Sequence, residues 1–429
     1  MNHIEIKCCF GQIKIIYNFV IMNIKLFHLI HTEKTFKRYY YQPINSKFPR
    51  RTYPVRRLKT WIESWLQSIY LPFNAKYNTQ QFSGIRKNKI KMLWENFVWC
   101  FKYKEACRYY FLYGLDLKGR NPNDYVAYTE FRVLRNILNF RVRENLPTLY
   151  TFNYLALARD KFVFYQYCKS LGMPYPQTIA LVSKGDVSWY DGERMEFSPL
   201  ESIKDKTFDG FCKEVNGESG KGAFCLKVEN GKLTDRGEEI SLDELRSRFG
   251  DATFIIQEKL RNHPAIDAVY DKSLNTIKLI TFLNDDGTVD FFDSVMRFGA
   301  GGNFVDNASR GGVFVGIEED GTLQEVGYHE PGIKKNLVVN GYHPDTNVKF
   351  GGMKIPYWDE LLATAKRFHK FFYGIPSIGW DVAITPNGFV FTETGEDWEI
   401  PVYQVTHGGL REKFYKYHGK ALDVKLRRY

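Results

Sequence analysis

The sequence predicts an α+β protein in which a basic, mainly helical region precedes a larger region of strands and helices. Apolar residues recur at helical spacing between residues 61 and 146, whereas short alternating runs typical of strands recur between residues 178 and 394. The charge changes near the same point, because residues 1–150 hold 26 Lys and Arg against 9 Asp and Glu, and the remainder is acidic on balance. A chain of 429 residues is long enough for two or three domains.

The first 150 residues divide into two predicted parts. Residues 1–60 form a basic, irregular lead-in with prolines near arginines, and residues 61–150 form helices. Two groups of apolar residues recur there at helical spacing, namely Trp94, Val98 and Phe101 with the stretch 107–113, and Phe131, Leu134, Ile137 and Leu138. This basic, aromatic region either contacts a membrane surface or an anionic glycan, or its charge excess is simply a solvated face. It contains no RNA- or DNA-binding motif, so no nucleic-acid partner is expected.

Seven cysteines are scattered along the chain without a CxxC pair, which argues for a reducing compartment and against a zinc site or a disulfide framework. No run of 18 apolar residues and no secretory signal is recognisable. We therefore expect a cytoplasmic protein that can lie at the inner face of the membrane. Met1 and Met22 are both candidate start sites.

From residue 159 onward the predicted elements follow one another closely. A helix begins after Asp160, an N-cap residue, and ends at Gly172, with Pro174 preventing its continuation. A second helix is predicted at 358–373. Strands are predicted at 178–182, 211–215, 224–228, 253–260, 265–271, 276–283, 288–298, 312–318, 379–385 and 388–394.

A glycine-rich loop joins the strands at 211–215 and 224–228. Its glycines and polar residues, together with a lysine on the preceding strand, are Gly217, Ser219, Gly220, Lys221, Gly222 and Lys213. Such a loop can bring backbone N–H groups close to an anion, and the lysines add positive charge. It lacks the GxxxxGK[ST] pattern and the following helix of a Walker A motif. The loop therefore indicates either another kind of phosphate site or an ordinary hairpin with surface lysines.

The last two predicted strands form a hairpin whose turn is centred on Asn387. Partners in an antiparallel pair have residue numbers with a constant sum, so Asp381 lies opposite Glu393 on the same face. Two such carboxylates repel each other unless a cation lies between them, and Mg²⁺ bound to nucleotide phosphates prefers oxygen ligands of this kind. The alternative is a one-residue shift in register that separates two exposed acids.

Further candidates lie between the loop and this hairpin. Gln257 and Glu258 end an apolar strand, where they either contact an adenine or form a polar strand end. Lys278 and Arg297 are isolated cations in neighbouring strands, and they either face solvent or stabilise the charge of a phosphoryl group during transfer. The glycine-rich stretch 297–312, which contains Asp306, is typical of a loop that lines a site.

The order of these motifs resembles the ATP-grasp superfamily over about residues 90–415. The matching residues are Asp160 with Lys161, Lys213, the loop 217–222, QEKL at 257–260, GWD at 379–381 and Glu393. SLNTIKLIT (273–281), RFGAGGNFVDNASRGG (297–312) and IGWDVAI (378–384) are most similar to the sugar-transfer-associated branch, which is related to the α-L-glutamate ligases.

The resemblance implies an ATP-grasp fold, in which two α+β subdomains clamp ATP. The domain would span 151–415, with a nucleotide-clamping subdomain at about 205–262 and a metal-binding subdomain at about 263–415. A basic tail would follow at 416–429.

The resemblance also implies roles for individual residues. Lys161 and Lys213 would contact ATP phosphates beneath the 217–222 loop. Glu258 and Leu260 would form the adenine hinge beside Gln257. The two carboxylates of the last hairpin, Asp381 and Glu393, would hold Mg²⁺.

Two positions depart from the family pattern. Gly395 stands where ATP-grasp enzymes usually have an asparagine metal ligand, so Glu396 or Asp397 would have to replace it. Lys278 stands where the branch usually has arginine, and lysine keeps the charge without the bidentate geometry.

The resemblance implies an ATP- and Mg²⁺-dependent ligase that phosphorylates a carboxylate and lets an amine attack the acyl phosphate to form an amide. The branch further implies a role in cell-surface polysaccharide biosynthesis, with a small molecule or glycan that carries a carboxylate as substrate. Two alternatives remain open from the sequence. One is a kinase-like phosphotransferase acting on a sugar or lipid hydroxyl, and the other is a non-catalytic nucleotide-binding accessory protein.

Overall fold

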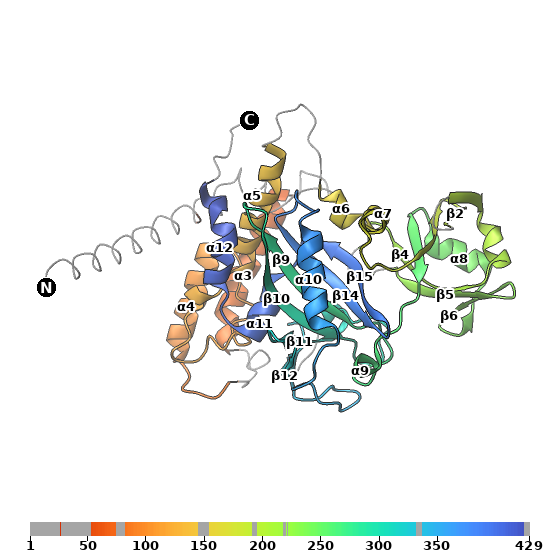
Figure 1. The fold of residues 1–429 in the computed structure, drawn as a ribbon. Coiled ribbons are helices and arrows are strands. Elements are labelled where there is room, and N and C mark those ends of the chain that lie inside the picture. Colours follow the sequence, from red (N-terminus) through yellow and green to blue (C-terminus); the bar gives the residue numbers. More distant parts are fainter. Residues whose placement is uncertain are drawn as a thin grey trace. The chain divides into compact units, whose positions relative to one another are not determined.

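The computed structural model describes residues 26, 53–73, 82–144, 154–190, 195–217, 220, 222–331 and 337–423. The chain forms two compact units, one of Met1–Thr151 with Glu399–Tyr429 and the other of Phe152–Trp398 (Figure 1). The predicted domain limits, with an end at residue 415, stay predictions, and the second compact unit ends at Trp398.

The first unit is mainly helical, as predicted. Its helices are α3 (Tyr53–Tyr70), α4 (Lys89–Tyr103), α5 (Tyr128–Glu144), α11 (Ile400–His407) and α12 (Arg411–His418), with 3-10 turns η2 (Leu71–Phe73), η4 (Pro122–Asp124) and η7 (Gly419–Asp423). Within the described part of the chain, no helix combines the length and the apolar character that crossing a bilayer requires.

Helix α5 buries the face that the sequence predicts. Phe131, Leu134, Ile137 and Leu138 are all buried. The prediction of helical structure at 107–113 is wrong, because α4 ends when Lys104 adopts a left-handed conformation and the following residues form turns.

A buried ion pair joins the end of the chain to α5. Arg411 Nη2 in α12 lies 2.7 Å from Glu130 Oε2 in α5, and the same nitrogen donates to the carbonyl oxygen of Tyr125 at 2.7 Å. The Glu130 side chain is fully buried, so its charge depends on this partner. The two C-terminal helices therefore belong to the first unit.

The second unit contains two antiparallel sheets. The first has the strand order β3-β2-β1-β8-β4-β5-β6-β7. Its strands are β1 (Thr178–Ser183), β2 (Asp186–Tyr190), β3 (Met195–Pro199), β4 (Phe208–Glu214), β5 (Phe224–Glu229), β6 (Lys232–Asp235), β7 (Glu238–Glu239) and β8 (Phe254–Glu258). Helix α8 (Leu242–Phe249) and turn η5 (Leu200–Asp205) contribute Leu245 and Ile203 to the core beneath this sheet.

The second sheet has the order β13-β12-β11-β10-β9-β14-β15. Its strands are β9 (Thr276–Leu283), β10 (Val289–Phe298), β11 (Val313–Ile317), β12 (Leu323–Tyr328), β13 (Val338–Asn340), β14 (Ser377–Thr385) and β15 (Gly388–Gly395). Helix α10 (Trp358–His369) packs on β9 and β10 (Figure 1). The helices α6 (Ala156–Arg159) and α7 (Lys161–Leu171) contact β15 and so bring the start of α7 to the edge of this sheet.

The ends of α7 agree with the sequence. The side chain of Asp160 accepts hydrogen bonds from the N–H groups of Phe162 and Val163, and Gly172 ends the helix in a left-handed conformation. The N-cap fixes where the helix begins, and Lys161 is therefore its first residue.

One predicted strand is wrong. Residues 265–271 begin in helix α9 (Pro264–Asp267), because His263 Nδ1 accepts a hydrogen bond from the Ala265 N–H and Pro264 supplies the backbone angle of a first helical turn. Ile266, Val269 and Tyr270 are buried at helical spacing, a pattern that a short apolar run does not distinguish from a strand. The predicted helix at 358–373 is also shorter, since α10 ends at His369.

Candidate functional site: a nucleotide and metal site in the second unit

Asp381 and Glu393 are register partners in the β14–β15 pair, as the sequence predicts. Next to the turn, however, the pairs from Thr385 with Gly388 to Val382 with Phe391 run one residue out of step with the predicted sum. Thr392 is the extra residue of a β-bulge that restores the predicted register at Asp381. The opposition of the two carboxylates is thus confirmed, although the sequence did not indicate the bulge that produces it.

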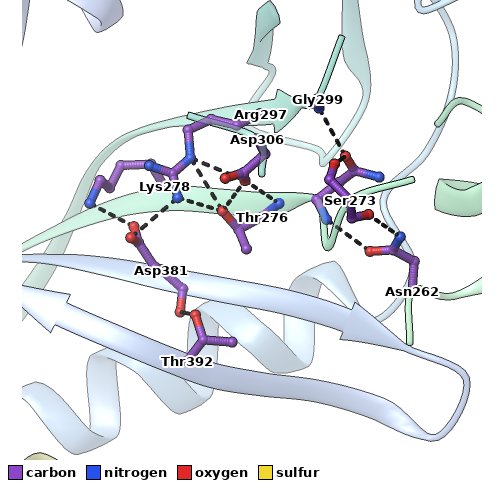
Figure 2. Close-up of polar contacts among 10 residues, drawn as sticks. Asn262, Ser273, Thr276, Lys278, Arg297, Gly299, Asp306, Asp381 and Thr392 are labelled. Atoms are coloured by element: carbon purple, nitrogen blue, oxygen red, sulfur yellow. Dashed lines mark hydrogen bonds and ion pairs between the residues drawn. The ribbon is translucent and has the colours of Figure 1, made fainter. Parts of the chain in front are cut away.

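Two cations hold the Asp381 carboxylate. Lys278 Nζ lies 2.6 Å from Oδ1, and Arg297 Nη2 lies 3.2 Å from Oδ2 (Figure 2). Burial alone would raise the pKa of Asp381, but Arg297 and Lys278 together bring that pKa below its usual value. Lys278 and Arg297, predicted either to face solvent or to stabilise phosphoryl charge, point at one carboxylate, and their catalytic role stays a prediction.

Arg297 on β10 is held by Thr276 on β9 and by Asp306 in the loop after β10. Its Nη2 donates to Thr276 Oγ1 at 2.5 Å, and its Nε lies 3.4 Å from Asp306 Oδ2. Asp306 also accepts hydrogen bonds from the N–H of Thr276 at 2.9 Å and from its hydroxyl at 2.5 Å (Figure 2). Burial raises the pKa of Asp306, while Arg297 opposes that rise. The loop predicted to line a site thus supplies the carboxylate that orients Arg297.

Lys161 and Lys213 meet β15 at the bulge. Lys161 Nζ lies 3.2 Å from Glu393 Oε1, and Lys213 Nζ donates to the carbonyl oxygen of Thr392 at 3.2 Å. Burial lowers the pKa of Lys213 to about 8, with Glu393 raising it and Lys161 lowering it. Both predicted phosphate-binding lysines therefore lie beside the predicted metal ligands.

The described part of the glycine-rich loop lies against the same residues. The carbonyl oxygen of Gly217 accepts a hydrogen bond from Lys161 Nζ at 2.6 Å. Gly220 and Gly222 have φ values of 63° and 70°, where a side chain is strained, and a Cβ on Gly220 would lie 3.3 Å from Asn307 Nδ2. Ser219 and Lys221, which the sequence adds to this loop, lie outside the described residues.

The predicted adenine hinge lies at the end of β8. Gln257 is buried, with its Nε2 directed at the carbonyl oxygen of Pro176 at 3.4 Å. Glu258 Oε1 accepts a hydrogen bond from the Gln177 N–H at 2.9 Å, and the Glu258 N–H donates to the carbonyl oxygen of Gln177. Leu260 is partly buried two residues beyond the strand. The carboxylate of Glu258 therefore has a structural partner, and the hinge role of these three residues stays a prediction.

The residues after β15 include the candidates to replace the asparagine ligand that this chain lacks. Gly395 pairs with Gly379 at the end of the hairpin. Glu396 is buried and accepts a hydrogen bond from Arg159 Nε at 2.6 Å, so its carboxylate is directed at α6. Asp397 is exposed. Glu396 therefore does not supply the missing ligand in this arrangement.

The donor set fits a magnesium ion that is held largely by a nucleotide. Among the residues that the structure describes, no group of three or more His, Cys, Asp or Glu side chains is placed to hold a metal. Asp381 and Glu393 supply two carboxylates side by side, each now balanced by a cation. Mg²⁺ commonly binds through one or two carboxylates together with phosphate oxygens and water.

Thr276 is the residue of this site that sequence reasoning missed. Its hydroxyl lies between Arg297 and Asp306. A threonine at the start of a strand is unremarkable in a sequence, and only the pairing of Thr276 with Arg297 in the β9–β10 register would have indicated it.

Comparison with known proteins gives a family match. The model of the sugar-transfer associated ATP-grasp family matches residues 143–416. No curated protein matches the chain.

Three solved structures illustrate its similarity to known folds. D-alanyl-alanine synthetase A from Vibrio cholerae is 8% identical over 62% of this chain and 65% of that one, with a TM-score of 0.36. Biotin carboxylase from Campylobacter jejuni is 13% identical over 64% and 48%, with a TM-score of 0.37. N5-carboxyaminoimidazole ribonucleotide synthetase from Thermus thermophilus is 13% identical over 63% and 52%, with a TM-score of 0.33. The chain thus spans about half to two thirds of these structures' own lengths.

Proposed function

This chain belongs to the sugar-transfer associated ATP-grasp family, and from that premise we propose that it is an ATP- and Mg²⁺-dependent ligase that joins a carboxylate to an amine. The family resemblance seen in the sequence is confirmed for residues 143–416. The observation that carries the proposal is the meeting of four cations with the β14–β15 hairpin, where Lys161 and Lys213 approach β15 and Lys278 and Arg297 hold Asp381.

The four cations would contact different groups before and after ATP binds. In the structure Lys161 and Lys278 pair with the carboxylates of Glu393 and Asp381, and Lys213 donates to the carbonyl oxygen of Thr392. When ATP binds, its phosphates replace these partners, and Lys161 and Lys213 turn to the phosphate chain. Asp381 and Glu393 would hold Mg²⁺, which would supply positive charge to offset that of the phosphates.

The proposed reaction needs few other side chains. An oxygen of the substrate carboxylate attacks the γ-phosphorus, the bond to the β,γ-bridging oxygen breaks, and ADP leaves. An amine then attacks the acyl carbon, phosphate leaves, and the amine loses a proton to solvent, so that an amide forms. Lys278 and Arg297 would stabilise the charge that accumulates on the transferred phosphoryl group, which is a matter of positioning and electrostatics.

The family supports a proposal for the substrate class. Its association with sugar transfer supports a glycan or small molecule with a carboxylate, such as a uronic acid, and a role in cell-surface polysaccharide biosynthesis in the cytoplasm. No described contact identifies the amine.

A trapping assay tests the proposal. The purified chain is incubated with Mg-ATP, uronic-acid oligosaccharides and hydroxylamine, and we expect ADP, phosphate and a hydroxamate. Lys213→Ala should abolish the product, whereas Lys227→Ala, an exposed lysine of β5 that pairs with Glu229, should leave it unchanged. A phosphoester without free phosphate would instead establish a phosphotransferase. Tight ATP binding without any product from a broad panel of carboxylates would favour a nucleotide-binding accessory protein.

A further inference from the structure

We propose that the outward side of helices α3 and α4 docks on an anionic lipid bilayer. The proposal concerns the first unit alone, so it does not depend on the ligase activity. The surface, called here the α3–α4 face, is formed by Ile62, Leu66, Ile69 and Phe73 from α3 and η2, and by Ile90, Trp94, Phe97 and Phe101 from α4.

Helix α3 has its polar and apolar sides reversed relative to an ordinary surface helix. The side chains at 62, 66, 69 and 73 recur at helical spacing, and they are between 49% and 62% exposed. Among positions 59–70, where the burial of the side chains is described, the buried one is instead Ser68, whose hydroxyl donates to the carbonyl oxygen of Ser64 at 2.8 Å. An amphipathic helix that buries serine and exposes isoleucine and leucine requires something apolar to cover it.

Helix α4 also exposes apolar side chains at this spacing, although its buried side is mainly apolar as well, with Met92, Trp99, Cys100 and Tyr103. The side chains at 90, 94, 97 and 101 are between 46% and 78% exposed. Its buried side includes Asn96, which is fully buried and donates from Nδ2 to the carbonyl oxygen of Met92 at 2.9 Å. The two helices therefore present apolar faces of matching length.

The two faces form one surface. Helices α3 and α4 pack against each other (Figure 1), and the rings of Trp65 and Phe97 lie 4.8 Å apart across them. Trp94 stacks on Phe97 at 5.7 Å. A hollow of about 370 Å³, lined by Leu66, Gln67, Tyr70 and Leu71, opens on the α3 side of this surface. Aromatic rings and aliphatic side chains are thus continuous from one helix to the other.

The charge near the α3–α4 face indicates which kind of partner covers it. Residues 53–104 contain ten Lys and Arg and two Asp and Glu, and of the cations Lys87 is buried against Glu95 and Arg86 pairs with Asp116. Lys89 Nζ lies 5.4 Å from the centre of the Phe73 ring, so a cation borders the apolar face directly. Helices that combine aromatic and aliphatic residues on one side with lysine and arginine beside them lie in the interface of membranes rich in anionic lipid. A protein partner would not need this excess of positive charge, and we therefore commit to a bilayer.

Vesicle flotation of the full chain tests the proposal. One set of vesicles is pure phosphatidylcholine, and in the other about one third of the lipid is phosphatidylglycerol. The double variant Leu66→Glu with Trp94→Glu removes the apolar character of both helices. The control is Phe197→Glu, an aromatic on β3 of the second unit that is 75% exposed.

We expect the unmodified chain and the control to float with the anionic vesicles, and the double variant to partition at least about tenfold less. Binding should weaken between about 0.1 M and about 1 M NaCl, because the attraction to the anionic surface is screened. Brominated lipid should quench tryptophan fluorescence in the unmodified chain, since Trp94 would enter the interface.

Three results would overturn the proposal. The first is a chain that does not bind anionic vesicles at low salt, and the second is a double variant that binds as well as the unmodified chain. The third is a double variant that binds vesicles unchanged but has a different oligomeric mass in solution. That result would show that a second copy of the chain covers the α3–α4 face. Circular dichroism checks that the variant folds, and the milder pair Leu66→Ser with Ile69→Ser replaces it if it does not.

Discussion

Lys213 Nζ lies 3.2 Å from the carbonyl oxygen of Thr392, the extra residue of the β14–β15 bulge. A bulge leaves one residue outside the regular pairing of the two strands, and here its free carbonyl is turned toward the first sheet of the second unit. The same bulge brings Glu393 opposite Asp381. One irregularity therefore places both a lysine partner and a candidate metal ligand.

The lowered pKa of Lys213, about 8, predicts a pH dependence of nucleotide binding. Because the folded protein holds this pKa below the usual value of lysine, the ammonium loses its proton as the pH rises through about 8, and ATP loses a cationic partner. We expect the affinity for ATP, measured by calorimetry without Mg²⁺, to fall several-fold between about pH 7 and about pH 9. Lys213→Arg, whose guanidinium stays charged, should bind ATP with little change over this range. An equal fall in both proteins would contradict the assignment.

The contact between Lys161 and Glu393 predicts opposite effects of one substitution. Glu393 competes with phosphate for Lys161 in the ligand-free protein, at 3.2 Å, and it is also a candidate Mg²⁺ ligand. Glu393→Gln should therefore bind ATP about two- to tenfold more tightly than the unmodified chain in EDTA, and more weakly in excess Mg²⁺. The measurement is a pair of titrations at constant ionic strength. Tighter binding under both conditions would exclude Glu393 as a metal ligand.

The orientation of Arg297 by Asp306 predicts a selective loss of turnover. Asp306→Asn keeps the size of the side chain and a carbonyl acceptor for Thr276, but it removes the charge that faces Arg297. We expect kcat to fall by about ten- to a hundredfold while the affinity for ATP stays the same, because Arg297 would act on the transferred phosphoryl group. Asp293→Asn, at another buried carboxylate of the second sheet, should affect stability and leave kcat unchanged.

Local patterns were sufficient to predict most of the second unit. The strands at 276–283 and 379–385, and the cap and end of α7, follow from alternation and from residues with a defined backbone preference. The family resemblance added the order of the motifs. Strands β2, β3, β6, β7, β12 and β13 and helix α8 were missed because they are short and mix apolar with polar residues. The segment at 265–271 was assigned wrongly because a short apolar run fits either periodicity.

The contacts of the site could be predicted only in part. Asp381 and Glu393 are neighbours in one hairpin, and so their opposition is a local property. Two other contacts, Lys161 with Glu393 and Asp306 with Thr276, join segments that are distant in the sequence. These contacts depend on how helices and sheets pack. The exposed apolar side of α4 could not be predicted either. Helical spacing identifies the apolar faces of a helix, but it does not say which of them is buried.

Replacing Gly395 with asparagine should improve the use of Mg²⁺. A Cβ at this position would have the Asp397 nitrogen as its nearest neighbour, at 3.8 Å, so a side chain can be accommodated. Gly395→Asn would add an oxygen beside the two carboxylates, and we expect the Mg²⁺ concentration for half-maximal activity to fall by up to about tenfold. Gly395→Leu has a similar size without the oxygen and is the control. Equal behaviour of the two variants would show that this position does not contact the metal.

A buried histidine predicts how the second unit responds to acid. His369 is fully buried, its Nε2 donates to the carbonyl oxygen of Ile375 at 2.9 Å, and its Nδ1 accepts from the Thr281 hydroxyl at 2.7 Å. Trp380 Nε1 donates to the same hydroxyl at 2.8 Å, which fixes its direction. Burial lowers the pKa of His369 to about 4, so the neutral ring is the folded form.

The stabilisation from the neutral ring is complete above the unfolded pKa of about 6.5 and is lost as the pH falls toward about 4, by up to about 3 kcal/mol in the free energy of unfolding. We therefore expect the urea midpoint, followed by the fluorescence of tryptophans such as Trp380, to fall more steeply between pH values of about 7 and 5 in the unmodified chain than in His369→Gln. His263→Gln, at a half-buried turn, is the matched control and should retain the slope of the unmodified chain. The assignment fails if His369→Gln retains that slope as well, because another group would then be responsible for the loss of stability in acid.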